Sequence, residues 1–359
     1  MKVCIIGDGL VSLTLAQVLI QKELAVDILS SKKDNKYDKT RTLGISKSNI
    51  DYFNDKIIDL RKISWKIKKI KIYTEKNTKD EILKFHNNNQ IFSIIKNYEL
   101  YKLLKKKLKK NKFIKFKNII NSKEIIKQDY KLIINCNPNH QITKKFFSNN
   151  IYKDYNSIAY TSTIDHKRVI DNNTAFQNFT NTGPIAFLPI SEKRTSVVYS
   201  MRVKNKKNNF DIKTLIKKYN PIYSITNIND CNCFKLRSSN LRKYYKENIL
   251  AFGDMLHKLH PLAGQGFNMS LRDIRELVQL IDHKLKLGLE LDSSICIDFE
   301  KKTKSKNYIF STGIDLIYEF FRLDNKMKNK LLTNSVNFLG KNKTINNFFK
   351  KVADSGLQI

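Results

Sequence analysis

Residues 249–274 read I-L-A-F-G-D-M-L-H-K-L-H-P-L-A-G-Q-G-F-N-M-S-L-R-D-I, a strand, a loop and the start of a helix in succession. The apolar run from Ile249 to Phe252 predicts a short buried strand that ends in Gly253 and Asp254. A carboxylate therefore stands at the tip of the strand, followed by a loop that contains Pro261.

The loop after Pro261 is rich in glycine and leads into a helix. Gly264, Gln265 and Gly266 let the backbone pass close to a flat or charged group, because glycine has no Cβ to block it. Apolar residues recur at helical spacing from Asn268 to Leu280, which predicts a helix there. The N–H groups of the loop then lie at a helix N-terminus, which favours an electron-rich or anionic ligand.

The first thirty residues predict a second nucleotide-binding element. A β-branched strand, residues 2–6, opens into Gly7-Asp8-Gly9-Leu10-Val11-Ser12, followed by a helix at 13–20 and a strand at 24–29. This is a βαβ unit, in which Gly7 and Gly9 form the tight turn that approaches a pyrophosphate and Ser12 takes the helix-packing position. The acidic residue expected after the second strand, to bind a ribose, is absent: Ser30 stands there, and Asp27 lies inside the strand.

The two motifs together resemble those of the FAD-dependent aromatic hydroxylases, the family of p-hydroxybenzoate-hydroxylase-like proteins. L-H-P-L-A-G-Q-G-F-N followed by L-R-D is most similar to the ubiquinone-biosynthesis hydroxylases, as is Phe179-Thr180 with Gly183-Pro184-Ile185-Ala186-Phe187-Leu188-Pro189. The resemblance runs from residue 1 to about residue 320.

The resemblance implies an α/β fold with a Rossmann-like FAD-binding domain, an inserted mixed or antiparallel β-sheet substrate domain, and a C-terminal helical segment. We expect the FAD-binding domain to comprise residues 1–70, 91–150 and 235–290, and the substrate domain residues 71–90 and 151–234. Residues 291–359 form the helical segment, with helices predicted at 295–309, 312–321, 326–338 and 345–353.

The family pattern assigns roles to individual residues. Arg41 lies in a segment that brings an arginine to the cofactor side of the substrate cavity, and Asn97 takes a polar position near the pyrophosphate, although Lys96 replaces the family's glutamate. An apolar wall of Phe179, Ile185, Phe187 and Leu188 would suit a phenol with a greasy tail. The resemblance implies that Pro261, Gly264 and Gln265 shape the reaction pocket. The residues that we expect to bind the cofactor are Gly7, Gly9, Ser12, Ser30, Arg41, Asn97, Gly253, Asp254, Gly264, Gly266 and Asn268.

One element departs from the family. After a buried strand at 132–136, the family has A-D-G-x-x-S-x-x-R, which is linked to FAD and NAD(P)H; this chain has Cys136-Asn137-Pro138, then Gln141 and Lys144. Proline fixes φ and removes an N–H that the glycine could donate. The expectation that NAD(P)H is the transient electron donor therefore rests on the resemblance to the family alone, because this element of the chain departs from the family's sequence.

Charge and cysteine content make several classes of protein less favoured. The net charge is +34, but lysine is spread along the whole chain and no basic arm or zinc-finger spacing accompanies it, so a solvated basic surface is favoured over specific nucleic-acid binding. Such a surface leaves peripheral contact with anionic lipids open. Cys231-x-Cys233 lacks the second pair that a zinc site needs, and His257-x-x-His260 has no third ligand nearby. We expect no metal and a reduced, cytoplasmic protein, with the inner face of the cell membrane as a peripheral alternative.

The function implied by the resemblance is hydroxylation of an aromatic ring of a polyprenyl-phenol in ubiquinone biosynthesis, with reduced FAD forming a C4a-hydroperoxide with O₂. The alternative is a catalytically impaired FAD-binding subunit or scaffold of a biosynthetic complex, which the changes at Ser30 and Asn137-Pro138 motivate.

Overall fold

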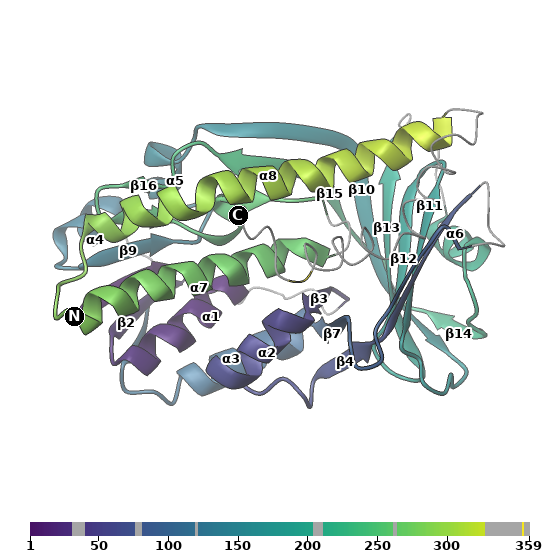
Figure 1. The fold of residues 1–359 in the computed structure, drawn as a ribbon, viewed down its shortest axis with the longest axis horizontal. Helices are drawn as coiled ribbons and strands as arrows, with labels where there is room; N and C mark the ends of the chain where they lie inside the picture. Colours follow the sequence, from purple (N-terminus) through teal and green to yellow (C-terminus); the bar gives the residue numbers. More distant parts are fainter. Residues whose placement is uncertain are drawn as a thin grey trace.

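The computed structural model describes residues 1–30, 40–75, 81–118, 121–203, 211–260 and 264–326, together with residue 354 (Figure 1). Its core is a six-stranded sheet in the order β16-β17-β9-β1-β2-β8. These strands are Tyr245–Lys246, Ile249–Ala251, Leu132–Asn135, Lys2–Ile6, Ala25–Ser30 and Ile114–Asn118.

All neighbours in this sheet are parallel except β16 and β17. The long runs of buried apolar residues in β1, β2, β9 and β17 explain this arrangement, because a parallel sheet is covered on both faces. Helix α1 (Leu10–Leu19) packs against α3 (Asn97–Leu108) and α7 (Gln265–Lys286) beside the sheet. The predicted βαβ unit and the strand before Gly253 are confirmed.

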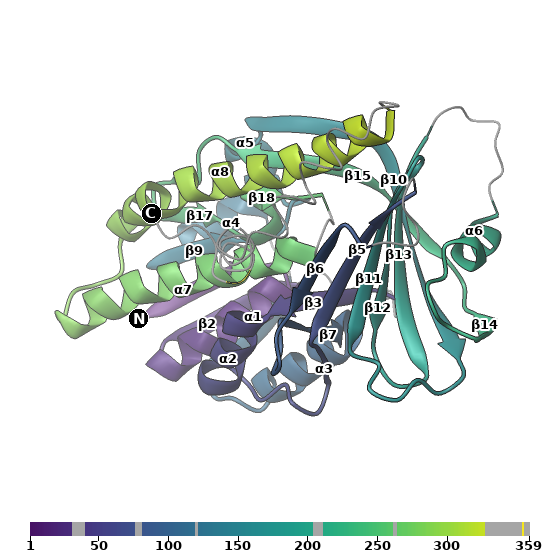
Figure 2. The same ribbon diagram turned by 45° about the vertical axis from the view of Figure 1, so that its right-hand side comes forward.

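A nine-stranded sheet forms the second half of the molecule (Figure 2). Its path is β18-β15-β10-β13-β12-β11-β5-β6, and β14 pairs with β10 beside that path. In that order the strands are His257–Lys258, Asn232–Leu241, Asn150–His166, Arg194–Arg202, Gly183–Pro189, Thr174–Thr180, Lys69–Thr74 and Leu83–His86, with β14 at Ile225–Ile228. Only β11 and β5 pair in parallel, so the sheet is mixed, as expected for the inserted domain.

Strand β15 starts at Asn232 and belongs wholly to this sheet, so the boundary expected at residue 235 falls inside a strand. A three-stranded sheet, β3-β7-β4, with helix α2 (Lys47–Lys56), lies between the larger sheets. Its strands are Thr42–Ser46, Phe92–Lys96 and Ser64–Ile67. The remaining short helices are α4 (Ser122–Lys127), α5 (Gln141–Phe146) and α6 (Ile212–Lys218).

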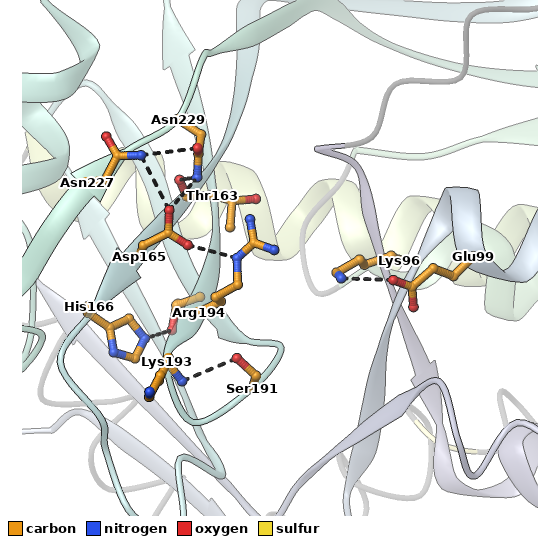
Figure 3. A network of polar contacts seen from close by, with 11 residues as sticks. Lys96, Glu99, Thr163, Asp165, His166, Ser191, Lys193, Arg194, Asn227 and Asn229 are labelled. Carbon is orange, nitrogen blue, oxygen red and sulfur yellow. Dashed lines mark hydrogen bonds and ion pairs between the residues drawn. The ribbon is translucent and has the colours of Figure 1, made fainter.

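The outer end of the nine-stranded sheet is fixed by a polar network around Asp165 (Figure 3). The register of β10 shifts between Asp165 and His166, and the carboxylate accepts from Arg194 Nε at 2.8 Å and from Asn229 Nδ2 at 3.1 Å. These bonds join β10, β13 and the turn after β14, so they stabilise the sheet where its ladder is irregular.

The apolar wall expected from the sequence is not formed, because its four residues lie on both faces of this sheet. Ile185 and Phe187 pack with Tyr199 and Tyr223 in a cluster beside α6, away from the six-stranded sheet. Phe179 packs instead with α7 and α8, and Leu188 packs with Trp65 and the β3-β7-β4 sheet. Alternate residues of a strand point to opposite faces, so Ile185 and Phe187 cannot share a wall with Leu188.

One helix, α8 (Ser293–Lys326), replaces the two predicted at 295–309 and 312–321 (Figure 1). Its buried side continues through Phe310, Ile314 and Tyr318, across Gly313. A helix-interior glycine costs only about 1 kcal/mol, and this burial offsets it. The helices predicted at 326–338 and 345–353 fall outside the described residues, apart from Lys326. Among the described helices, none combines the length and hydropathy needed to cross a membrane.

Candidate active site

The turn between β1 and α1 has the properties of an anion site. Gly7 has φ +105°, which favours glycine, and its N–H donates to the carbonyl of Leu29 at 2.8 Å. Gly9 begins α1 with no side-chain cap, and a Cβ placed on it would meet nothing within 4 Å. The first turn of the helix contains no acidic residue. Backbone donors and an open space therefore meet at a helix N-terminus.

Asp8, between the two glycines, is turned toward helix α3. The hydroxyl of Tyr101 donates to its Oδ2 at 3.3 Å, and Nζ of Lys105 lies 3.7 Å from the same oxygen. Its negative charge is thus partly balanced by α3, which reduces its repulsion of an anion at the turn.

The second candidate element emerges at the same edge of the sheet. Strand β17 is parallel to β9, and β9 is parallel to β1, so Asp254 follows its strand where Gly7 follows β1. Gly253 has φ +68°, and a Cβ there would lie 3.1 Å from Cγ1 of Val11. Asp254 is exposed, and within the described ranges no hydrogen bond to its carboxylate is found. It is free to accept bonds from hydroxyl groups of a ligand.

Ser12 lies between these two elements. It is buried in the first turn of α1, beside the thiol of Cys136. Burial raises the pKa of that thiol to about 12, the Ser12 hydroxyl counteracts the shift, and the charge of Asp254 adds to it. Ser12 and Cys136 therefore lie close together at the carboxyl edge of the sheet, within reach of the charge of Asp254.

Asn268 fixes the glycine loop to the rest of the protein. Its Oδ1 accepts from Ser46 N and from Asn49 Nδ2, both at 2.9 Å. Its Nδ2 donates to the carbonyls of Gly44, at 2.8 Å, and Gly264, at 3.2 Å. The side chain is buried and fully used within the protein, so it positions the loop where the sequence suggested a direct cofactor contact.

Gly264 and Gly266 have separate roles at the start of α7. Gly264 adopts φ +63°, and a Cβ there would approach the backbone nitrogen of Gly44 to 3.4 Å. A Cβ on Gly266 would meet nothing within 4 Å. The first glycine lets two backbones pass close together, and the second leaves space beside the helix N-terminus.

Gln265 connects the loop to an arginine in a largely apolar setting. Its Oε1 accepts from Arg272 at 3.4 Å, and the Arg272 guanidinium lies 4.6 Å above the ring of Phe310. Burial lowers the pKa of Arg272 to about 10, so the group stays cationic at neutral pH. Pro261, the third residue expected to shape the pocket, lies outside the described residues, as do residues 262 and 263.

Arg41 and Asn97 meet through their backbones. The N–H of Asn97 donates to the carbonyl of Arg41 at 3.0 Å, and the exposed Arg41 guanidinium lies 5.2 Å from the ring of Phe234 in β15. Lys96, which replaces the family's glutamate, is paired at 2.9 Å with Glu99 in the first turn of α3 (Figure 3). At the junction of β7 and α3 the positive charge of Lys96 is thus balanced by Glu99.

The ribose end of the site is the least complete. Ser30 is the last residue of β2, opposite Asn118, and the chain beyond it is not among the described residues until position 40. Asp27 is buried and bonds to Lys2, Lys117 and Tyr130. As expected, Asp27 does not face the ligand edge.

The altered segment at Asn137-Pro138 is in direct contact with the first glycine turn. A Cβ on Gly7 would lie 3.5 Å from Cβ of Asn137. Asn137 Oδ1 accepts from Asn139 N, and its carbonyl accepts from Thr143 Oγ1 at 2.7 Å. The segment forms a closed turn before α5, so its polar groups serve the fold.

Sequence reasoning missed the buried pair of His257 and Asp273. Nε2 of His257 lies 2.5 Å from Oδ2 of Asp273, and Oδ1 of that carboxylate accepts from Asn307 at 2.9 Å. The signal was present, because His257 follows Asp254 closely and Asp273 ends the L-R-D run. Asp354 was also missed: its Oδ1 accepts from Ser48 N at 2.9 Å at the start of α2, a contact with no local sequence signal.

The residues described fit an extended dinucleotide. Gly7 and Gly9 supply a turn with free space, Asp254 supplies an exposed acceptor, and Gly266 leaves room at a second helix N-terminus. The substrate-domain sheet faces this edge: Thr42 and Ser196 hydroxyls lie 2.9 Å apart, and Phe179 contacts Met269 of α7.

Sequence and structure comparisons agree with this geometry. A family model described as "FAD binding domain" matches residues 143–287. The chain is 21% identical over 274 residues to the ubiquinone biosynthesis monooxygenase COQ6 of Schizosaccharomyces pombe, covering 63% of this chain and 57% of that protein. It is 28% identical over 156 residues to the 3-demethoxyubiquinol 3-hydroxylase of Escherichia coli, covering 41% and 40%.

Solved structures share the whole architecture. The p-nitrophenol 4-monooxygenase PnpA of Pseudomonas putida superposes with a TM-score of 0.77 at 11% identity, covering 97% of both chains. The chain therefore shares the fold of this monooxygenase. HpxO of Klebsiella pneumoniae, in complex with FAD and uric acid, superposes with a TM-score of 0.75 at 11% identity, covering 99% of this chain and 97% of that one.

The fold of FAD-dependent aromatic hydroxylases is therefore confirmed for this chain. The chain spans about half the length of the curated relatives that it matches.

Proposed function

We propose that this protein is an FAD-dependent monooxygenase that hydroxylates the aromatic ring of a prenylated phenol in ubiquinone biosynthesis. The observation that carries the proposal is the fixed glycine loop, in which Asn268 holds Gly264 and Gly44 together at the edge where Asp254 emerges. When bound, reduced FAD would supply the oxygen-activating chemistry, and the protein would bind, orient and shield the reactants.

Each part of the edge would hold a different part of the cofactor. The Gly7 and Gly9 turn and the N-terminus of α1 would hold the pyrophosphate, because backbone donors there have no side-chain cap. Asp254 would accept bonds from ribityl hydroxyls. Gly264, Gln265 and Gly266 would bring backbone donors at the start of α7 to the ring system.

The substrate would lie between this loop and the nine-stranded sheet. Leu188 and Val198 belong to the face of that sheet opposite Tyr199, and both remain partly accessible. They offer apolar contact for an aromatic ring, and the cluster of Phe179, Met269 and Phe310 continues that surface beneath α8.

A second candidate is an FAD-binding subunit without hydroxylase activity. The closed turn at Asn137-Pro138 favours it, because its polar groups are used internally next to Gly7. NADH or NADPH would then fail to reduce the bound flavin, although the flavin itself would still bind.

Flavin spectroscopy of the purified protein tests these proposals. We expect a yellow protein whose absorbance bleaches on addition of NADH or NADPH and which then consumes oxygen in the presence of a prenylated phenol. Bound flavin that no nicotinamide reduces, with no oxygen uptake, would support the subunit instead. A colourless protein that FAD cannot reconstitute would overturn both.

Asp254→Ala tests the location of the site. We expect it to lose FAD while its far-UV circular dichroism stays that of the wild type. Asp298→Ala, which removes an exposed carboxylate from α8, is the matched control and should retain FAD. Stoichiometric FAD in Asp254→Ala would show that the ribityl contact lies elsewhere.

A further inference from the structure

Helix α8 has two apolar sides, and only one of them is buried. Phe310, Ile314 and Tyr318 face inward. Between them Ile309 is 47% exposed and Leu316 is 65% exposed, accompanied by exposed Tyr308 and Ile317. A surface helix normally turns polar residues outward, so this outer face is unusual for a helix that only covers a core.

The charge around this outer face is mostly positive. The exposed positions of α8 from residue 298 to 317 are Asp298, Lys301, Lys302, Ser305, Tyr308, Ile309, Leu316 and Ile317, and Asp298 is the single acidic residue among them. The acidic residues of that half of the helix, Asp315 and Glu319, lie within 4.0 Å of Lys153 on β10, which balances their charge.

A cavity of about 510 Å³ opens beside the basic end of this face. Arg242, Lys301 and Lys304 line it together with Ile151 and Tyr308. The one carboxylate among the lining residues, Glu300, already accepts from Tyr244 N at 2.6 Å and pairs with Lys304 at 3.3 Å. The cavity therefore combines an apolar wall with excess positive charge.

The buried side of the same part of α8 contacts the proposed substrate region. Phe310 and Ile314 form one cluster with Phe179 of the nine-stranded sheet and Met269 of α7. An α-helix with its side chains is only about 10–12 Å across. The exposed apolar face thus lies about one helix diameter from the cluster of Phe310, Ile314, Phe179 and Met269.

We propose that the outer face of α8 docks onto an anionic lipid bilayer, with Ile309, Leu316 and Ile317 entering the acyl boundary. Lys301, Lys302 and Arg242 then meet lipid headgroups, and the cavity takes a headgroup phosphate. Apolar residues beside a basic rim are the composition that binds an anionic membrane surface, through buried apolar area together with electrostatic attraction. This docking would bring α8 and the cluster of Phe179 and Met269 next to apolar molecules dissolved in the bilayer.

Co-sedimentation with vesicles of phosphatidylglycerol and phosphatidylcholine tests the proposal. Wild-type protein should pellet with the vesicles, and Leu316→Glu and Ile309→Glu should each lower the partition coefficient at least roughly tenfold. Ile170→Glu is the matched control, because Ile170 is 76% exposed in the turn after β10 and the charge change is the same. Equal loss in the control would show that net charge alone drives binding and would overturn the proposal.

A fluorescence measurement separates the bilayer from other occupants of the face. In a Trp65→Phe background, which removes the one native tryptophan, Leu316→Trp should emit as a solvent-exposed indole in buffer, shift to the blue on vesicles and be quenched by brominated acyl chains. A blue-shifted emission without vesicles would mean that protein covers the face. Sedimentation velocity then shows whether a second copy does so; either result overturns the proposal. These readouts need no turnover, so their failure would leave the proposed hydroxylation untouched.

Discussion

Nε2 of His257 and Oδ2 of Asp273 lie 2.5 Å apart, with both side chains almost completely excluded from solvent. The other carboxylate oxygen accepts from Asn307, so Asp273 joins strand β18, helix α7 and helix α8 at one point. Strand β18 and the start of α7, which flank the glycine loop, are therefore each fixed by a buried polar side chain, Asp273 and Asn268 respectively.

Asp273→Ala should destabilise the protein by about 3–5 kcal/mol, because it leaves two buried donors without an acceptor. Urea unfolding followed by circular dichroism measures the change. Asp282→Ala on the same helix removes only a partly exposed pair with Lys22 and should cost at most about 1 kcal/mol. Similar losses in the two variants would contradict a special role for the buried pair.

Asn268→Ala should lower the free energy of unfolding by about 2–4 kcal/mol, because four hydrogen bonds of a buried amide are lost. It should also weaken FAD binding, since Gly264 is no longer held against Gly44. Urea unfolding and a fluorescence titration with FAD measure the two effects. Gln279→Ala, on the exposed side of α7, should change neither the stability nor the FAD affinity. Unaltered FAD affinity in Asn268→Ala would show that the glycine loop keeps its position without the bonds of Asn268.

Gly9→Ala separates folding from cofactor binding. The added Cβ meets nothing in the protein, so the unfolding free energy should fall by less than about 1 kcal/mol. FAD affinity should fall at least roughly tenfold, or about 1.4 kcal/mol, if the pyrophosphate occupies that space. Gly313→Ala also places a Cβ in open space and should bind FAD normally. Normal binding by Gly9→Ala would move the pyrophosphate away from this turn.

Asp27 should make stability depend on acid pH. Burial by itself would raise the pKa of this carboxyl, but bonds from Lys117, Tyr130 and Lys2 together lower it below its ordinary value of 3.8. A lowered folded-state pKa stabilises the protein above the unfolded pKa, near 4, and that stability is lost as pH falls through the folded pKa.

The comparison with Asp27→Asn isolates this contribution. The variant should be less stable than the wild type at neutral pH, and the difference should shrink below about pH 4. Urea midpoints measured across that range provide the check. A difference that stays constant down to the acid end would mean that the charge of Asp27 contributes nothing.

The sequence predicted those parts of the fold that local patterns determine. The βαβ unit, the strand before Gly253 and the helix expected over 268–280 follow from apolar spacing and glycine position, and the structure has all three. The pairing of β5 with β11 and the docking of Asp354 on α2 depend on contacts between distant residues, which no local pattern encodes.

The sequence predicted the kind of site better than it predicted the role of each residue in it. The glycines and Asp254 lie at one edge of the parallel sheet, as their motifs imply. Asn268 was expected to touch the cofactor and instead bonds within the protein, because a side-chain amide can satisfy backbone groups on either side of a loop. Ile185 and Phe187 do not share a wall with Leu188, because alternate residues of strand β12 point to opposite faces of the sheet.

The parallel pairing of β5 with β11 has a consequence for synthesis on the ribosome. Lys69 to Thr74 leave the ribosome about 100 residues before Thr174 to Phe179, which at 5–20 residues per second is a delay of roughly 5–20 s. Throughout that time the hairpin of β5 and β6 presents an unpaired edge. Its strands contain Lys69, Lys71 and Lys84. Lysines at strand edges discourage pairing with other chains. We therefore expect the same lysines that raise the net charge to disfavour aggregation of the nascent chain while the rest of the sheet is made.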